Sequence, residues 1–137
     1  MPVSIIQLGT PRKSDEGLRI GTVRRPPRGV KKFDFATKNY YDIWYPNLSP
    51  SATLVKEALA AKDERDINAF RRKFRAEMAH PDRSRELDLL AALSHHANFS
   101  VGCYCEDETR CHRFVLRDLL EERGAKLTNP SKSPAPH

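Results

Sequence analysis

Three short runs of apolar and β-branched residues constrain the fold of this chain more than any other feature. They span residues 3–8, 18–23 and 98–105, and a break or a charged loop follows each run. Runs of this length and composition are typical of buried strands. Apolar residues at helical spacing predict helices over four ranges: 53–62, 64–79, 83–97 and 110–124.

Strands and helices in this order predict a mainly parallel sheet with helices on both faces. We therefore expect a single three-layer α/β domain of the Rossmann-like kind over residues 1–127. Residues 41–45 are the candidate for an edge strand, and residues 125–127 can form a short final strand. Residues 128–137 are rich in proline and serine, which predicts a disordered tail.

The chain has 137 residues and no apolar run that approaches the ~20 residues of a membrane-spanning helix. Its three cysteines are odd in number and clustered, unlike the spread cysteines of a secreted disulfide framework. The first residues also lack the features of a signal peptide. The sequence therefore predicts a cytoplasmic protein that does not bind membranes. It predicts no cofactor and sets no oligomeric state.

Positive charge is concentrated in residues 11–33. The net charge of the chain is +6, and this segment alone has an excess of six positive side chains. Such an excess favours an anionic partner, namely a phosphate, a nucleotide or a nucleic acid, and the alternative is a solvated basic surface. The aromatic residues that follow would supply stacking rings to a nucleic-acid-binding module without catalysis, although packing under a loop explains them more simply: Tyr40, Tyr41, Trp44 and Tyr45.

Ligands of parallel α/β sheets bind beyond the carboxyl ends of the strands. This rule places three loops on one rim, namely residues 9–12, 24–29 and 105–113. We therefore expect the basic segment and the cysteine cluster to lie together. The arginines predicted to bind an anion on this rim are Arg12, Arg24, Arg28, Arg113 and Arg117.

Cys111 is the cysteine with a physical reason to react. It opens the last predicted helix, where unpaired N–H groups and the helix dipole favour a thiolate. His112 could orient or activate this thiol, and Glu106 or Glu108 in the preceding acidic loop could move protons. The leading hypothesis is an anion-binding α/β protein with a reactive thiol, with or without enzymatic activity.

Two other interpretations of the cysteines stay open. A metal site would use Cys105, Cys111 and His112, although their spacing is not that of a familiar zinc motif. A thiol sensor would pair Cys105 with Cys111, because Cys103 in the strand body is typical of a small buried hydrophobe. The Cys-x5-Arg pattern from Cys111 to Arg117 is a coincidence, because the intervening residues include no glycine to wrap a phosphate.

The segments "FSVGCYCEDETRCHR" and "LRDLLEERGAKL" resemble the end of domain-of-unknown-function family 488, a set of small bacterial and archaeal proteins. Members typically carry a strand that ends in cysteine near an acid, and then Cys-His-Arg at the start of a helix; the counterparts here are Cys103, Cys105, Glu106, Cys111, His112 and Arg113. "IIQLGTPR", "GTVRRPPRG" and "IWYPNLSPS" are also similar to the family. The resemblance covers residues 4–127 and implies an α/β fold without a function. Thr22 stands where many relatives carry an acid.

Overall fold

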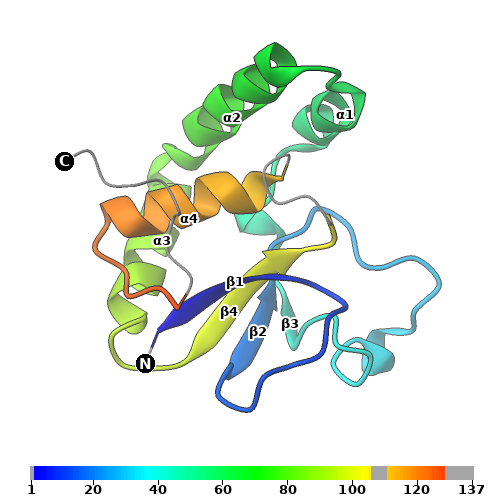
Figure 1. Ribbon diagram of the computed structural model, residues 1–137, viewed down its shortest axis with the longest axis vertical. Helices are drawn as coiled ribbons and strands as arrows, with labels where there is room; N and C mark the ends of the chain where they lie inside the picture. The colour runs from blue at the N-terminus through cyan, green and yellow to red at the C-terminus, as the bar shows by residue number, and fades with distance from the viewer. Residues whose placement is uncertain (1, 106–110, 129–137) are drawn as a thin grey trace.

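The sheet at the centre of the molecule has four parallel strands. This computed structural model describes residues 2–105 and 111–128, and the strand order is β1-β4-β2-β3 (Figure 1). The strands are β1 (Val3–Gln7), β2 (Leu18–Gly21), β3 (Ile43–Trp44) and β4 (Phe99–Cys103). Although β4 is the last strand in the sequence, it pairs with both β1 and β2. The short β3 forms one edge, as predicted for residues 41–45.

Four α-helices and two 3-10 helices complete the described fold. They are η1 (Lys32–Asp34), η2 (Pro46–Leu48), α1 (Ala52–Ala60), α2 (Glu64–Met78), α3 (Pro81–Leu93) and α4 (His112–Glu122). The side chain of Asp63 accepts a hydrogen bond from a backbone N–H of the first turn of α2, which confirms its predicted role as a cap. Ser51 caps α1 in the same way.

The third helix begins earlier than predicted. Its first residue is Pro81, whereas the sequence pattern predicts a start at residue 83. The side chain of His80 accepts a hydrogen bond from the N–H of Asp82 and thereby caps the helix. Proline suits the first helical position because its fixed φ is already helical and its missing N–H has no partner there.

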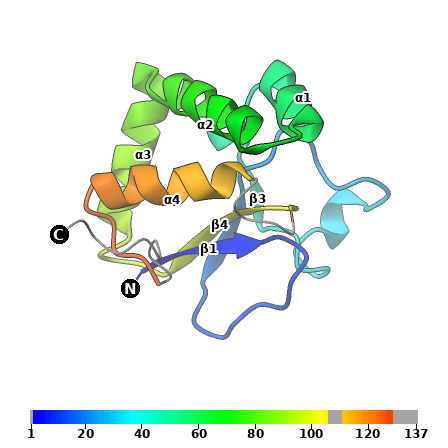
Figure 2. The same ribbon diagram turned by 45° about the horizontal axis from the view of Figure 1, so that its top comes forward.

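One face of the sheet is apolar and lies beneath the α-helices. Side chains alternate between the two faces along a strand, and the buried ones on this face include Val3, Ile5, Ile20, Phe99 and Val101. Figures 1 and 2 show α4 crossing over β1 and β4, with α2 and α3 on the same side of the sheet. The buried residues of these helices join the same hydrophobic cluster and form the main core.

The opposite face is more polar and is covered by the two connections that follow β1 and β2. Arg19 and Ser100 are fully buried there, and the ring of Tyr41 lies so close to Gly21 that a Cβ atom would collide with it. The four-stranded parallel sheet with its four helices confirms the predicted single α/β domain of the Rossmann-like kind. The second covering layer consists of connections and the short helix η1 rather than of an α-helix.

The segment after α4 returns to the outer edge of β1. The N–H of Val3 donates to the carbonyl of Lys126 (2.8 Å), and the N–H of Thr128 donates to the carbonyl of Val3 (2.9 Å). The predicted final strand is present as a parallel bridge between Val3 and Leu127. The predicted disordered tail lies, from residue 129 onward, outside the described residues. In the described part of the chain, no helix has both the length and the apolar character needed to cross a membrane.

Candidate functional site

The carboxyl end of β4 and the start of α4 bring two cysteines together. Cys103 is the last residue of β4, and Cys111 immediately precedes α4 with an extended backbone (φ −116°, ψ 152°). Their Sγ atoms are in contact, and their Cα atoms are 7.9 Å apart. The residues are only 1% and 2% exposed. The site therefore contains a buried pair of sulfur atoms, whereas the sequence predicted a single reactive thiol at a helix start.

His112 directs an imidazole nitrogen toward this pair. Its Nε2 lies 2.6 Å from the carbonyl oxygen of Thr22 and must carry the proton, because a carbonyl only accepts. Nδ1 then presents its lone pair 3.6 Å from the Sγ of Cys111. Burial lowers the pKa of His112 to about 4, the hydrogen bond to Thr22 opposes this shift, and the charge of Arg113 adds to it. At neutral pH the ring is therefore a neutral hydrogen-bond acceptor.

Thr22 holds the imidazole in this orientation. It is fully buried directly after β2, and its backbone N–H and its hydroxyl both donate to the carbonyl of Gly102 at 3.0 Å. The contact between β2 and β4 therefore positions the carbonyl that binds His112. The group that orients His112 is a backbone carbonyl, so it does not depend on the acid that the family resemblance implies at this position.

The two cysteines belong to a small cluster of buried, mostly apolar side chains. Leu8, Val23 and Tyr41 are buried with Cys103 and Cys111 in a small cluster beside the main core. The ring of Phe74 from α2 meets the ring of His112 edge-on, with 5.4 Å between the centroids. An environment of such low polarity disfavours an isolated charge, which is the reason that the imidazole stays neutral.

The structure corrects the predicted role of Cys105. The sequence interpretation made it the partner of Cys111 both in a thiol pair and in a metal site, but Cys103 takes both positions and Cys105 is exposed. The physical reason is that β4 ends at Cys103, so the alternation of side chains along a strand does not extend to Cys105. The predicted proton carriers Glu106 and Glu108 lie outside the described residues.

Two of the predicted anion-binding arginines are buried on α4. Arg113 is 4% exposed, and its Nη2 donates to the carbonyl of Cys105 at 2.5 Å. This bond ties the start of α4 to the end of β4 and so holds Cys111 close to the strand. Arg117 is buried as well, with only 8% of its surface exposed.

The three upstream arginines have other partners or face solvent. Arg12 makes two hydrogen bonds to the carboxylate of Asp42, at 2.8 and 2.9 Å. Arg24 donates to the backbone carbonyls of residues 49 and 50. Arg28 is exposed in the connection between β2 and β3. The structure does not test whether these side chains bind an anion, so that role stays a prediction.

Sequence reasoning missed a buried polar cluster on the other face of the sheet. Nε and Nη2 of Arg19 donate to the two carboxylate oxygens of Glu16, at 2.8 and 3.0 Å. Nη1 of Arg19 donates to the carbonyls of Thr10 and Asn39, and the hydroxyl of Ser100 donates to Glu16 at 2.8 Å. The sequence did carry a signal for this cluster, because Arg19 lies inside a predicted strand. Side chains alternate between the two faces of a strand, so Arg19 must point to the face opposite that of the neighbouring buried Ile20.

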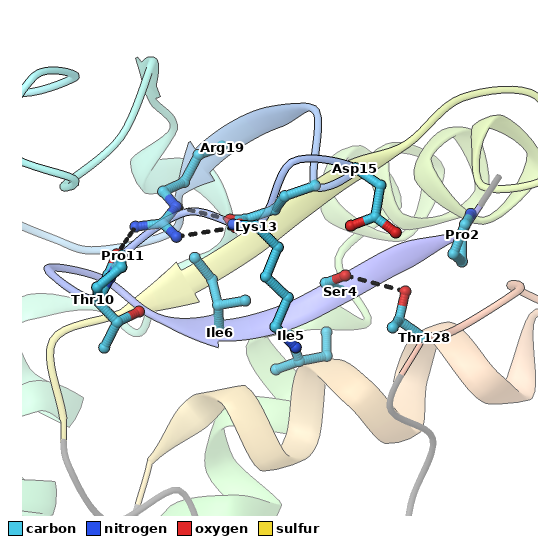
Figure 3. A pocket seen from close by; sticks show the side chains of 11 residues that line it. Pro2, Ser4, Ile5, Ile6, Thr10, Pro11, Lys13, Asp15, Arg19 and Thr128 are labelled. Atoms are coloured by element: carbon cyan, nitrogen blue, oxygen red, sulfur yellow. Dashed lines mark hydrogen bonds and ion pairs between the residues drawn. The ribbon is translucent and has the colours of Figure 1, made fainter.

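A pocket of about 310 Å³ opens beside this cluster. Figure 3 shows the guanidinium of Arg19 bonded to other groups in the wall of the pocket. Burial raises the pKa of Glu16, but hydrogen bonds from Arg19, Ser100 and a backbone N–H outweigh it, so the pKa is lowered overall. The ion pair is therefore bonded to its own surroundings, and we interpret it as structural.

Comparison with known proteins identifies the family. The sequence model of DUF488-N3a, described as the active DUF488-N3 subclade, matches residues 3–124. Neither the curated proteins nor the solved structures contain a match to the chain. The family match includes all four strands and the Cys103, Cys111 and His112 cluster, and it confirms the resemblance seen in the sequence. The chain therefore belongs to the DUF488 family.

Proposed function

We propose that this protein performs thiol redox chemistry at Cys103 and Cys111. The contact between the two Sγ atoms is the observation that supports this function most directly. Two thiols in contact can be oxidised together to a disulfide. A cysteine that acts only as a nucleophile does not require a second sulfur atom beside it, so the pair favours redox chemistry. The description of the family as active names no reaction, so the proposal depends on the chemistry of the site.

His112 acts as the proton acceptor in this proposal. Its neutral Nδ1 is 3.6 Å from the Sγ of Cys111, so it can receive the thiol proton while this sulfur attacks the oxidant, and no charged imidazolium has to form beforehand in the apolar site. Cys111 stands at the N-terminus of α4, where the helix dipole favours negative charge. Cys103 is fixed at the end of β4 and serves as the second thiol.

The proposed oxidant is a hydroperoxide, with hydrogen peroxide as the simplest case. The Sγ of Cys111 attacks one peroxide oxygen while its proton passes to Nδ1 of His112, the O–O bond breaks, and the departing hydroxide takes that proton and leaves as water. The thiol of Cys103 then attacks the sulfenic acid of Cys111, an S–S bond forms, and water leaves. In total, two thiols and one hydrogen peroxide give one disulfide and two waters. The two sulfurs lose two electrons, and the peroxide gains them.

Mass spectrometry of peroxide-treated protein tests this function. We expect the wild type to lose the mass of two hydrogen atoms and to yield a linked peptide that joins Cys103 to Cys111. Cys105→Ser is the matched control and should form the same link. Cys103→Ser should stop at a sulfenic acid on Cys111, which a 1,3-diketone reagent traps. A link through Cys105, or wild-type protein that keeps all three thiols, would contradict the proposal.

Binding of an anionic ligand is a second candidate function, and an exposed basic run supports it. Arg25, Arg28, Lys31 and Lys32 are exposed in the connection between β2 and β3, ahead of the exposed ring of Trp44. This connection leaves the sheet at the edge where the parallel neighbour β4 also ends. A phosphate, a nucleotide or a nucleic acid has the charge to bind there.

Fluorescence anisotropy with a labelled single-stranded oligonucleotide tests this second function. Because binding to phosphates releases counterions, the logarithm of the affinity should fall linearly with the logarithm of the salt concentration. Arg25→Ala with Arg28→Ala should reduce that slope, whereas Cys111→Ala should not change it. An affinity that does not depend on salt would exclude the basic run as the binding surface.

A further inference from the structure

We infer that the reduced protein binds one zinc ion through Sγ of Cys103, Sγ of Cys111 and Nδ1 of His112. In residues 2–105 and 111–128, these residues form the one group of three metal-ligating side chains, and their ligand atoms all lie within 4.8 Å of one another. All three residues are buried. The inference rests on the same cysteine pair as the proposed function, but it concerns the reduced thiols and requires no oxidant.

The distances between the ligand atoms suit a tetrahedral zinc site. Zinc lies ~2.3 Å from sulfur and ~2.0 Å from nitrogen, which places a sulfur and a nitrogen ligand about 3.5 Å apart. The Sγ of Cys111 and the Nδ1 of His112 are 3.6 Å apart. The two sulfur atoms must move from contact to a separation of about 3.8 Å. Their Cα atoms are 7.9 Å apart, which is wide enough to hold the sulfur atoms at that separation, whereas formation of the disulfide must draw the two Cα atoms toward the usual ~4.4–6.8 Å.

The partner of His112 is the kind that zinc-binding histidines have. A ligating histidine usually donates its second ring N–H to a carbonyl or a carboxylate, which fixes the tautomer and the orientation of the ring. Here Nε2 donates to the carbonyl of Thr22 at 2.6 Å, and Thr22 is itself held by Gly102. The nitrogen that faces the sulfur atoms is therefore the one with the lone pair. This orientation is fixed by the pairing of strands rather than by the ion.

The charges of the site also favour a divalent ion with an affinity for sulfur. Two thiolates neutralise one Zn²⁺, so the complex brings no net charge into the apolar surroundings of Leu8, Val23 and Tyr41. Thiolate and imidazole ligands select zinc over magnesium and calcium, which prefer oxygen. Three protein ligands leave the fourth tetrahedral position to water or to a small ligand, as in catalytic zinc sites.

Zinc binding and oxidation compete for the same two sulfur atoms. When hydrogen peroxide oxidises both zinc-bound thiolates, an S–S bond forms, the O–O bond breaks, and one Zn²⁺ and two hydroxide ions are released. Zinc should therefore slow the oxidation of Cys103 and Cys111, and the disulfide form should bind no zinc.

Titration of the reduced protein with Co²⁺, followed by Zn²⁺, tests the site. We expect one equivalent of Co²⁺ to produce a sulfur-to-cobalt charge-transfer absorption, and one equivalent of Zn²⁺ to abolish it. Cys103→Ser, Cys111→Ser and His112→Gln should each weaken this signal at least tenfold at a fixed concentration of Co²⁺. The matched controls are Cys105→Ser and His96→Gln, which change an exposed cysteine and an exposed histidine and should leave the titration unchanged.

Two results would overturn the inference. One is a reduced wild type with three titratable thiols that gives no charge-transfer absorption and no increase in melting temperature with Zn²⁺. The other is an unchanged signal in folded Cys103→Ser or Cys111→Ser. If one of these variants does not fold, the other carries the same expectation. A protein that binds zinc but forms no disulfide with peroxide when it is reduced and zinc-free would refute only the proposed function, and one that forms the disulfide but binds no zinc would refute only the zinc site.

Discussion

Two regions of the sheet bury polar atoms for different reasons. On the face covered by connections, Arg19 and Ser100 both bond to Glu16, and the remaining side-chain bonds of Arg19 go to backbone carbonyls. At the carboxyl end of β4, Cys103 and Cys111 meet beside a lone pair of an imidazole, in a cluster of buried, mostly apolar side chains. The first cluster uses its bonding capacity within the fold, whereas the second brings two thiols and an imidazole together. We therefore interpret a buried polar cluster as structural when hydrogen bonds within the fold occupy its donors and acceptors, and as a candidate for chemistry when they do not.

Removal of Arg19 should have the largest effect on stability. Arg19→Met leaves the carboxylate of Glu16 buried without its cation, which should lower the free energy of unfolding by about 3–5 kcal/mol. Urea denaturation measures this loss, and the Cys103–Cys111 link should still form with peroxide in the folded fraction. If Arg19→Met does not fold, Ser100→Ala tests the same cluster and should cost about 1.5–3 kcal/mol, because it removes a hydrogen bond to a charged group. No loss of stability in either variant would show that the cluster is not structural.

Substitution of Cys103 should reduce stability less than Arg19→Met does, but it should abolish disulfide formation. Cys103→Ser places a hydroxyl in an apolar cluster, which should lower the free energy of unfolding by about 1–3 kcal/mol under reducing conditions. The same variant should form no intramolecular disulfide. Cys103→Ala is the control, because it removes the sulfur without adding a polar group and should lose less stability. A serine variant as stable as the wild type would mean that the cluster admits water.

The polar cluster should also give the protein a dependence on pH. The pKa of Glu16 is lower in the folded protein than the ordinary value of 4.5, so its ionised form stabilises the fold. This contribution is complete above the ordinary pKa and is lost as the pH falls through the folded value. Urea denaturation of the wild type and of Glu16→Gln, from neutral pH downward, should show a difference that shrinks at acidic pH. A difference that stays constant over that range would contradict the assignment.

The smallest effect is expected at Cys105. This residue is exposed, so Cys105→Ser should change the free energy of unfolding by no more than about 0.5 kcal/mol. Thermal melts of reduced protein are sufficient to check it. A clear loss of stability would indicate that the carbonyl of Cys105, which accepts from Arg113, depends on this side chain for its position.

The architecture could be predicted because its signals are local. Short β-branched runs, helical periodicity and the cap at Asp63 each specify structure within a few residues, and the structure contains the corresponding elements. The start of α3 was misplaced because the pattern of apolar residues does not include its first turn, which a histidine cap and a proline define. Local signals thus predict that an element exists better than they predict its ends.

The site was harder to predict because it depends on contacts between distant residues. The sequence named Cys111 and His112 as candidates, and they are in contact in the structure, but the choice between Cys103 and Cys105 depends on where β4 stops. The carbonyl of Thr22, which selects the tautomer of His112, has no signature in the sequence, because every residue has a carbonyl. The charge of residues 11–33 likewise does not reveal that Arg19 points inward.

The central position of β4 has a consequence for the order of folding. Because β1 and β2 meet only through a strand that is synthesised some eighty residues after β2 begins, the four-stranded sheet cannot be completed until the ribosome has passed Cys103, even though β2 and β3 pair directly. Residues 126–128 then cover the outer edge of β1. The sulfur pair and the strands that position it are therefore completed in one late step. The chemistry proposed for Cys111 is therefore expected only of the finished molecule.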